Sequence, residues 1–214
     1  MLKIKIISAL LMIAGVILFS YPKVAEMVED ARQQKLEKDW IASFQNVESV
    51  SESTQVPPVS DEIGTVESSP QDTAELMKSY AGSGKVEGIL EIDKIGLRLP
   101  IMEGATNRNL KTTAASIEHT GTAGEVGNYA IAGHRNRTYG RNFNRLDELE
   151  AGDQLKVDTG EASYQYTVTE KTLVKPEDVW VLEGDGSSKE ITLVTCHPID
   201  NPTYRLIVKG RIIP

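Results

Sequence analysis

The sequence predicts a mainly β protein, a closed or nearly closed β-barrel of seven or eight strands with short helices, preceded by a transmembrane helix and a flexible stalk. Three observations predict this arrangement: an apolar run near the N-terminus, a polar stretch punctuated by prolines, and a series of short β-patterned runs in the rest of the 214 residues. We therefore divide the chain into an N-terminal transmembrane signal anchor (1–23), a helical and disordered stalk and spacer (24–80) and a barrel domain (81–214).

The anchor is predicted from an unbroken apolar run over residues 6–19, with Lys3 and Lys5 before it and Lys23 after it. The length of this run lies between that of a signal-peptide core and that of a full membrane span. No small-residue cleavage site follows it, and the flanking lysines can snorkel and lengthen the effective span, which favours a retained anchor over a cleaved secretory signal. Positive charge before the run and acidic residues after it predict a cytoplasmic N-terminus and an exported remainder.

The stalk begins with a charged segment rich in helix formers over residues 24–44, which contains no Gly or Pro and predicts a weakly amphipathic juxtamembrane helix. Residues 46–71 are acidic, rich in Ser and Pro and almost free of aromatic side chains, as is typical of a disordered spacer. A short helical piece is expected at 72–80. This organisation predicts a barrel that can reach some distance from the membrane.

The barrel is predicted from strand-like runs after Gly84 that are separated by clusters of Gly, Asn and Asp. The expected strands are 88–93, 98–102, 128–134, 154–158, 162–173, 190–196 and 204–213, with a weaker one at 114–117. Short helices or turns are expected at 144–152 and 176–182. So many short strands in about 130 residues are typical of a closed or nearly closed barrel.

The composition excludes several kinds of site. A net charge of −8 with scattered Lys and Arg argues against a nucleic-acid partner. A single cysteine excludes an intramolecular disulfide framework and a cysteine-rich zinc site, and the three histidines lack metal-ligand spacing, so no metal site is predicted. The cysteine, Cys196, is therefore either a small core residue or a reactive thiol.

The position of Cys196 favours a reactive thiol. It closes the expected strand 190–196, and the loop that follows contains two prolines, which cannot donate to a strand ladder. The strand 204–213 then returns antiparallel, which brings Arg205 towards Cys196. A guanidinium close to a thiol favours the thiolate and can hold a developing oxyanion, although a solvated strand charge is the simpler interpretation of Arg205 taken alone.

A nucleophilic thiol also needs a proton carrier. His134 follows Gly133 and other small residues at the end of an expected strand, where close approach of a backbone or ligand is possible. The other candidates are His119, in a loop rich in Thr and Gly, and His197, whose side chain should point to the opposite side of the strand from Cys196.

Taken together, TLVTC at 192–196, an arginine nine residues after the cysteine in YRLIVKGR, and AIAGHR upstream resemble the sortase family, the membrane-anchored cysteine transpeptidases of Gram-positive bacteria. The segments GILEIDKIGLRLPIMEG and FNRLDELEAGDQLKV are similar to other parts of that family. The resemblance covers roughly residues 85–213 and includes the anchor and spacer. An anchor before the barrel and the lack of a long lid resemble class A or class D members more than the pilin-polymerising class.

The resemblance implies specific roles for four residues. Cys196 would be the nucleophile that attacks a backbone carbonyl within an LPxTG-type sorting signal of a secreted surface protein and forms a thioester. His134 would protonate the leaving amine, Arg205 would stabilise the oxyanion and Thr195 would help to hold the substrate. An amine of the peptidoglycan precursor would then resolve the thioester.

The resemblance implies no required cofactor. Some sortases bind calcium through acids in two loops, where this chain has Glu118 and Glu125 and then Glu183 and Asp185. Exposed loop acids are usually only solvated, so we expect no calcium site. Two other interpretations remain: an exported Cys–His protease or amidase with a hydrolytic outcome, and a non-catalytic membrane-tethered β-barrel in which Cys196 is buried packing.

Overall fold

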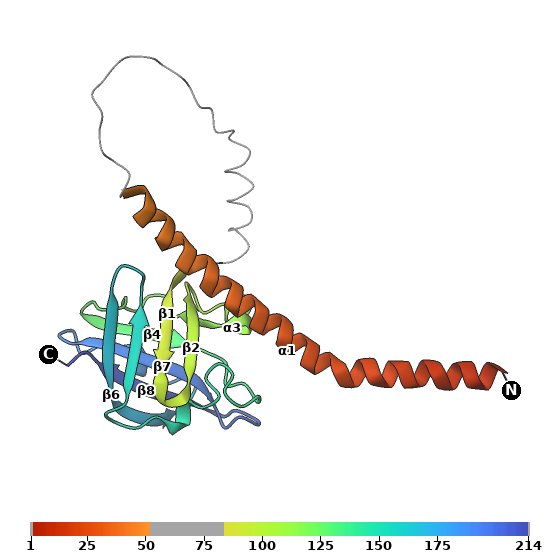
Figure 1. The fold of residues 1–214 in the computed structure, drawn as a ribbon. Helices are drawn as coiled ribbons and strands as arrows, with labels where there is room; N and C mark the ends of the chain where they lie inside the picture. The colour runs from red at the N-terminus through yellow and green to blue at the C-terminus, as the bar shows by residue number, and fades with distance from the viewer. Residues whose placement is uncertain (1, 52–83, 214) are drawn as a thin grey trace, which may run out of the picture.

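The computed structural model describes residues 2–51 and 84–213 as one long helix and a β-barrel beside it (Figure 1). The expected helical piece at 72–80 and most of the expected spacer lie outside the described residues. The barrel closes in the order β1-β2-β3-β4-β7-β8-β6-β5, which confirms the predicted fold class. Its strands are β1 (Val86–Ile92), β2 (Leu97–Met102), β3 (Ala114–Ser116), β4 (Gly127–Ala132), β5 (Gln154–Asp158), β6 (Ser163–Val174), β7 (Lys189–His197) and β8 (Tyr204–Arg211).

Two of the neighbouring strand pairs, β2/β3 and β4/β7, are parallel, and the others are antiparallel. The parallel β4/β7 pair joins segments about 60 residues apart in the chain, and the 3-10 helices η2 (Leu146–Glu148) and η3 (Val179–Leu182) lie in the connections between them. These two helices fall within the two segments where short helices or turns were expected. The pairing matters for function because it sets the end of β4 beside the end of β7.

Two short elements were not expected from the sequence. The 3-10 helix η1 (Asp93–Ile95) turns the chain from β1 into β2, and Gly96 ends it in the left-handed region with φ of 61°. The helix α3 (Asn107–Thr112) begins after Thr106, whose hydroxyl accepts a hydrogen bond from the Asn109 N–H at 3.2 Å. A single helical turn of polar residues has no apolar periodicity, so only its capping threonine marks it in the sequence.

The core lies inside the barrel, where the inward-facing aliphatic and aromatic side chains of the strands meet. Phe143 and Leu146, from the connection after β4, close one part of it and are fully buried. Burying such side chains stabilises the folded state by about 1.5–3 kcal/mol each. The largest fully buried side chains are Tyr166, Phe143, Ile89, Leu90, Ile92, Leu99, Ile101, Ile131, Leu146, Leu149, Leu155 and Ile191.

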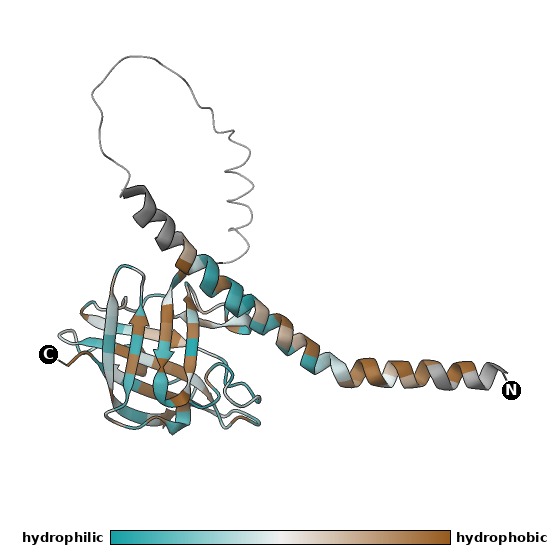
Figure 2. Cartoon of the chain, viewed as in Figure 1, coloured by the Kyte–Doolittle hydropathy of each residue, from teal (hydrophilic) through white to brown (hydrophobic). Residues whose placement is uncertain are grey.

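The N-terminal helix α1 (Leu2–Ser51) is continuous and extends past residue 44, where we expected the helical segment to end. Its N-terminal part is apolar and its later part is mostly polar, and the helix changes direction part-way along its length (Figure 2). Pro22 lies inside α1 and accounts for a bend, because proline removes one helical hydrogen bond and crowds the preceding turn. Within the described residues, Leu10–Ala42 contains a stretch with mean hydropathy of 1.5 that is not buried, long and apolar enough to cross a membrane by length and composition.

We expected the polar part of α1 to be a free stalk. In the structure it lies against the barrel. Gln33 donates to Asn142 at 2.9 Å, and Glu37 accepts from Arg98 Nε at 2.5 Å. These contacts are made by polar side chains, so a search for an apolar helix face does not find them.

Candidate active site

Cys196 is the second-last residue of β7, and its side chain is half-buried. Along the second half of this strand the buried Leu193 and Thr195 point to the barrel interior, whereas Val194 and Cys196 are only partly covered. This alternation is the one that the sequence predicts for a strand with one face in the core. The thiol is therefore presented on the outer face of the barrel wall rather than in its core.

Arg205 lies directly opposite Cys196 in the antiparallel β7/β8 ladder. Residues paired in this way point to the same face, with Cβ atoms about 4.5–5.5 Å apart. The guanidinium is partly exposed, and its Nη1 donates to the carbonyl of Tyr204 at 3.1 Å. The hairpin thus sets a cation and a thiol side by side, as expected from the returning strand.

His134 reaches the same end of the barrel from β4. Ala132 pairs with Val194 in the parallel β4/β7 ladder, and the Gly133 N–H continues the ladder by donating to the Val194 carbonyl at 3.1 Å. The chain leaves the ladder at this point, and the next residue, exposed His134, lies at the end of the barrel where β7 carries Cys196. The three predicted catalytic side chains therefore come from the ends of three adjacent strands.

Thr195 has its hydroxyl on the core side of β7. The side chain is buried, and Oγ1 donates to the Gly133 carbonyl at 2.7 Å. This hydrogen bond ties the end of β7 to the residue before His134. The predicted contact of Thr195 with substrate remains a prediction.

Gly133 has no room for a side chain. A Cβ at this position would lie 2.6 Å from the ring of Phe143, which is fully buried and cannot move away cheaply. The Phe143 N–H also donates to the His134 carbonyl at 3.1 Å. The glycine before His134 is thus required for close packing of the chain on this ring.

The comparisons with known proteins agree with this geometry. The family model of the Sortase domain matches residues 90–213, which is more than half of the chain. The chain belongs to the sortase family. Sortases are cysteine transpeptidases, so this protein is an enzyme of that class.

Named relatives fall in more than one sortase class. This sortase is 32% identical to Sortase A of Bacillus anthracis over 66% of the chain and 67% of the relative, and 30% identical to Sortase D of Bacillus subtilis over 60% and 65%. The solved structure of a Clostridium perfringens Sortase D5 transpeptidase superposes with a TM-score of 0.57 at 31% identity, covering 69% of this chain and 91% of that one. The chain thus spans about two thirds of the length of the two curated relatives.

One residue of the site was missed by sequence reasoning. The side chain of Arg135 is only 4% exposed, and its Nη2 pairs with the Asp147 carboxylate at 2.7 Å. Its Nη1 lies 2.6 Å from His197 Nδ1. Because a guanidinium can only donate, this ring nitrogen accepts and the imidazole proton is on Nε2. Arg135, next to His134, is in this way joined to His197, next to Cys196.

The other two histidines of this sortase have different places. His197 points away from Cys196 to Arg135, as strand alternation predicted. His119 is exposed and occupies a left-handed turn conformation with φ of 63°.

The acids considered for calcium do not gather into a site. In the part of the chain that the structure describes, no group of three or more His, Cys, Asp or Glu side chains could hold a metal ion. The Asp185 carboxylate accepts hydrogen bonds from the hydroxyls and backbone N–H groups of Ser187 and Ser188, and these bonds, led by the Ser188 hydroxyl, hold its pKa below the usual range. Asp185 thus orders its own turn.

Apolar side chains are exposed near the same end of the barrel. β6 ends at Val174, which pairs with Arg205 on the side of β8 away from Cys196. The connection that follows carries η3, on which Val179 and Trp180 are 66% and 58% exposed. The connection between β6 and β7 thus begins beside Arg205 and carries exposed apolar side chains.

Proposed function

We propose that this chain is a membrane-anchored extracellular sortase that cleaves an LPxTG-like sorting signal and transfers the secreted protein to an amine of the peptidoglycan precursor. The observation that carries the proposal is the pairing of Cys196 with Arg205 across the β7/β8 ladder, with His134 two residues past the end of the neighbouring strand β4. A transpeptidase needs a nucleophile, a proton carrier and an oxyanion partner at one place, and these residue types meet that need.

The proposed reaction has two steps. The Cys196 thiolate attacks a backbone carbonyl of the sorting signal, and the negative charge that develops on its oxygen is stabilised by the Arg205 guanidinium. His134, as the imidazolium, gives its proton to the leaving amine as the C–N bond breaks, which leaves a thioester on Cys196. The incoming amine then attacks the thioester carbonyl, neutral His134 takes a proton from it, and the thiolate leaves as the new amide forms.

The roles of the supporting residues follow from their contacts. Thr195 and Gly133 hold the ends of β7 and β4 together through their 2.7 Å hydrogen bond, and through this bond Thr195 would help to shape the position where the substrate binds. The exposed Val179 and Trp180 offer apolar surface to the leucine and proline of the signal. A sortase C structure from Clostridium perfringens was solved with a C-terminal cell wall sorting motif, at 28% identity and a TM-score of 0.57 over 62% of this chain and 72% of that one, which supports a peptide substrate of this kind.

The proposed location follows from α1. Its apolar N-terminal part serves as a single membrane span, with the N-terminus in the cytoplasm and the barrel outside the cell. The charge distribution around the apolar run supports this orientation, because lysines precede it and acids follow it. No cofactor takes part.

The proposal is tested with the full chain in detergent micelles and a reporter peptide that contains LPxTG. With an excess of a primary amine we expect the acyl fragment to appear as a new amide, and mass spectrometry should detect its thioester on Cys196. Cys196→Ala should remove both products while cooperative unfolding persists, and Arg205→Lys should lose most activity because an ammonium lacks the planar donor fork. Turnover by Cys196→Ala would disprove the nucleophile, and purely hydrolytic products in excess amine would make the enzyme a protease instead.

A further inference from the structure

The half-buried residues of α1 recur every three or four positions and therefore lie on one face of the helix. We call this face the docking stripe. Its members are Glu26, Glu29, Gln33, Leu36, Glu37, Trp40 and Ile41, and the more exposed Asp30, which also contacts the barrel, lies at its edge. The stripe is polar at its N-terminal part and apolar at its C-terminal part, and it lies against α3, β1 and β2 of the barrel.

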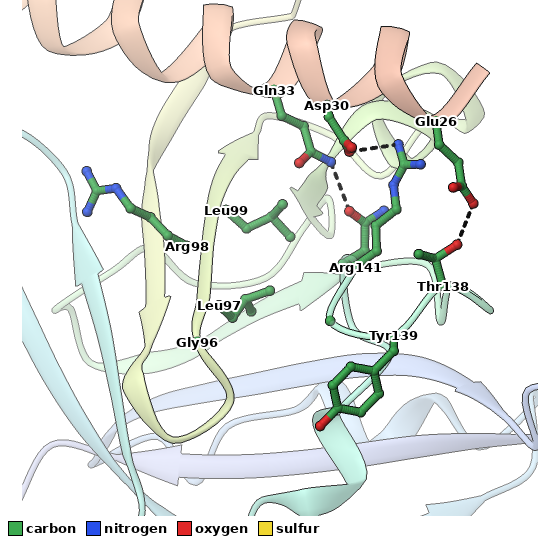
Figure 3. Close-up of a pocket in the computed structure, with 12 residues that line it drawn as sticks. Glu26, Asp30, Gln33, Gly96, Leu97, Arg98, Leu99, Thr138, Tyr139 and Arg141 are labelled. Atoms are coloured by element: carbon green, nitrogen blue, oxygen red, sulfur yellow. Dashed lines mark hydrogen bonds and ion pairs between the residues drawn. The ribbon is translucent and has the colours of Figure 1, made fainter. Parts of the chain in front are cut away.

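Three α1 side chains hold the turn formed by residues 138–142, which begins four residues after His134 (Figure 3). Glu26 accepts from the Thr138 hydroxyl, and Asp30 pairs with Arg141 at 3.3 Å. Figure 3 shows these side chains reaching from α1 towards the turn, around a pocket of about 270 Å³.

Gln33 ties this turn to the body of the barrel. Its Nε2 donates both to Asn142 Oδ1, at 2.9 Å, and to the carbonyl of Thr112 at the end of α3. Glu29 accepts from the Thr112 hydroxyl at 3.2 Å. The helix therefore fixes the turn relative to a rigid element rather than only covering it.

The turn at residues 138–142 is also connected to the backbone of His134. Asn142 forms a β-bridge with Arg135. Its backbone has a left-handed conformation with φ of 46°, which residues other than glycine adopt less readily than an extended conformation. The next residue, Phe143, donates its N–H to the His134 carbonyl and packs its ring on Gly133. A continuous set of contacts thus leads from Gln33 through Asn142 to His134.

We propose that the docking stripe is an intramolecular binding surface that positions His134, so that the enzyme is fully active only while α1 is docked on the barrel. The inference rests on the proposed catalytic role of His134. Polar and ionic contacts at a partly exposed surface are individually weak, so we expect the docked state to be reversible and weakened by salt. Asp30 forms an ion pair with Arg141, whose side chain is only 10% exposed, so undocking leaves this cation without that carboxylate.

The experiment compares full-length variants in detergent micelles by two measurements, the kcat and KM of amide formation and the hydrogen exchange of the Phe143 amide. For Gln33→Ala and Asp30→Ala we expect kcat to fall by at least about threefold with little change in KM, since the histidine and not the peptide site is displaced. Exchange at Phe143 should accelerate in both. The exposed neighbour Gln34 supplies the matched control, and Gln34→Ala should behave as wild type in both measurements.

Exchanging the charges of Asp30 and Arg141 tests whether kcat can be rescued. Arg141→Asp should lower kcat, and the double variant Asp30→Arg, Arg141→Asp should recover much of that loss because the ion pair is restored in reverse. Unchanged exchange and kcat in Gln33→Ala and Asp30→Ala would overturn the proposal, and so would faster exchange with unchanged kcat. If wild type forms no amide at all, the proposed function fails, whereas the exchange measurement still decides whether α1 docks.

Discussion

Arg135 connects the two strand ends that carry the predicted histidine and nucleophile. Its guanidinium is buried, which is tolerable because Asp147 compensates the charge and His197 accepts a further hydrogen bond. The backbone carbonyl of Asn144 lies 3.4 Å from its Nε. This one cation therefore joins the connection after β4 to the end of β7.

Removing the acceptor on His197 should destabilise the protein. We expect His197→Ala to lower the free energy of unfolding by about 1–3 kcal/mol, because it leaves a buried guanidinium N–H without a partner. His197→Asn should lose less, since the amide oxygen can accept in place of Nδ1. Urea unfolding measures both, and Gln34→Ala, at an exposed position of α1, is the control that should stay near wild type. Equal losses for the alanine and asparagine variants would show that the hydrogen bond is not the cause.

At the scale of the strands, two tyrosines are buried in the barrel wall. Tyr129 of β4 donates to Glu87 at 2.8 Å, and burial, followed by the negative charge of Glu87, raises its pKa far above the usual value. Burial also raises the pKa of Tyr166 of β6, although the hydrogen bond from the Gly124 N–H acts in the opposite direction. Both phenols are therefore held neutral in the folded barrel.

The difference between the tyrosine pKa values of the folded and the unfolded chain predicts a loss of stability at high pH. In the unfolded chain both phenols ionise near pH 10, whereas in the folded chain they keep their protons, so the unfolded state binds fewer protons above that pH. The free energy of unfolding should then fall as the pH rises through 10, with a slope that approaches about 1.4 kcal/mol per pH unit for Tyr129, and the raised pKa of Tyr166 should act in the same direction. Urea unfolding between pH 9 and 11 measures the slope, and Tyr129→Phe should reduce it. Ionisation of both tyrosines near pH 10 in the folded protein, seen by absorbance, would contradict the prediction.

Local sequence patterns were sufficient to predict most strands but not to predict where each strand begins and ends. β5 (Gln154–Asp158) has the expected limits, whereas β4 stops at Ala132 rather than at His134. The reason is that Gly133 packs on Phe143 and the chain leaves the ladder there, a contact that sequence periodicity does not contain. The pairing of Cys196 with Arg205 could be predicted because a short hairpin joins them.

Contacts between distant segments were not predictable in the same way. Arg135 and His197 meet only because β4 and β7 are parallel neighbours, and nothing in either local sequence indicates that pairing. The docking stripe was missed for a different reason. Its positions recur with helical spacing, but Glu26, Gln33 and Glu37 are polar, so hydropathy alone assigns this face to solvent.

At the scale of the whole molecule, docking of α1 limits how far the barrel can lie from a membrane. The apolar run ends at Phe19 and the stripe begins at Glu26, which is about 10 Å along a helix. The helix is continuous between these points, apart from the bend that Pro22 accounts for. The site should therefore be held near the bilayer surface rather than carried on a long free stalk.

Because Cys196 is the only cysteine, one fluorophore attached to it reports this distance. In nanodiscs with acceptor-labelled lipid headgroups, we expect energy transfer from labelled wild type to exceed that from labelled Gln33→Ala, in which α1 docks less well. Gln34→Ala should match wild type. Equal transfer from all three would mean that the stripe does not set the height of the barrel.

The closed strand order has a consequence for how a polypeptide client is recognised. A barrel of eight mutually paired strands offers no unpaired edge among them, so an incoming peptide cannot join the sheet as a ninth strand and gain affinity from main-chain pairing. Selection must then depend on the shape and chemistry of individual client side chains, read by loops at one rim. If the proposed function holds, we expect this enzyme to discriminate between short tags that differ at single positions and to be indifferent to the general β-propensity of the chain that carries them.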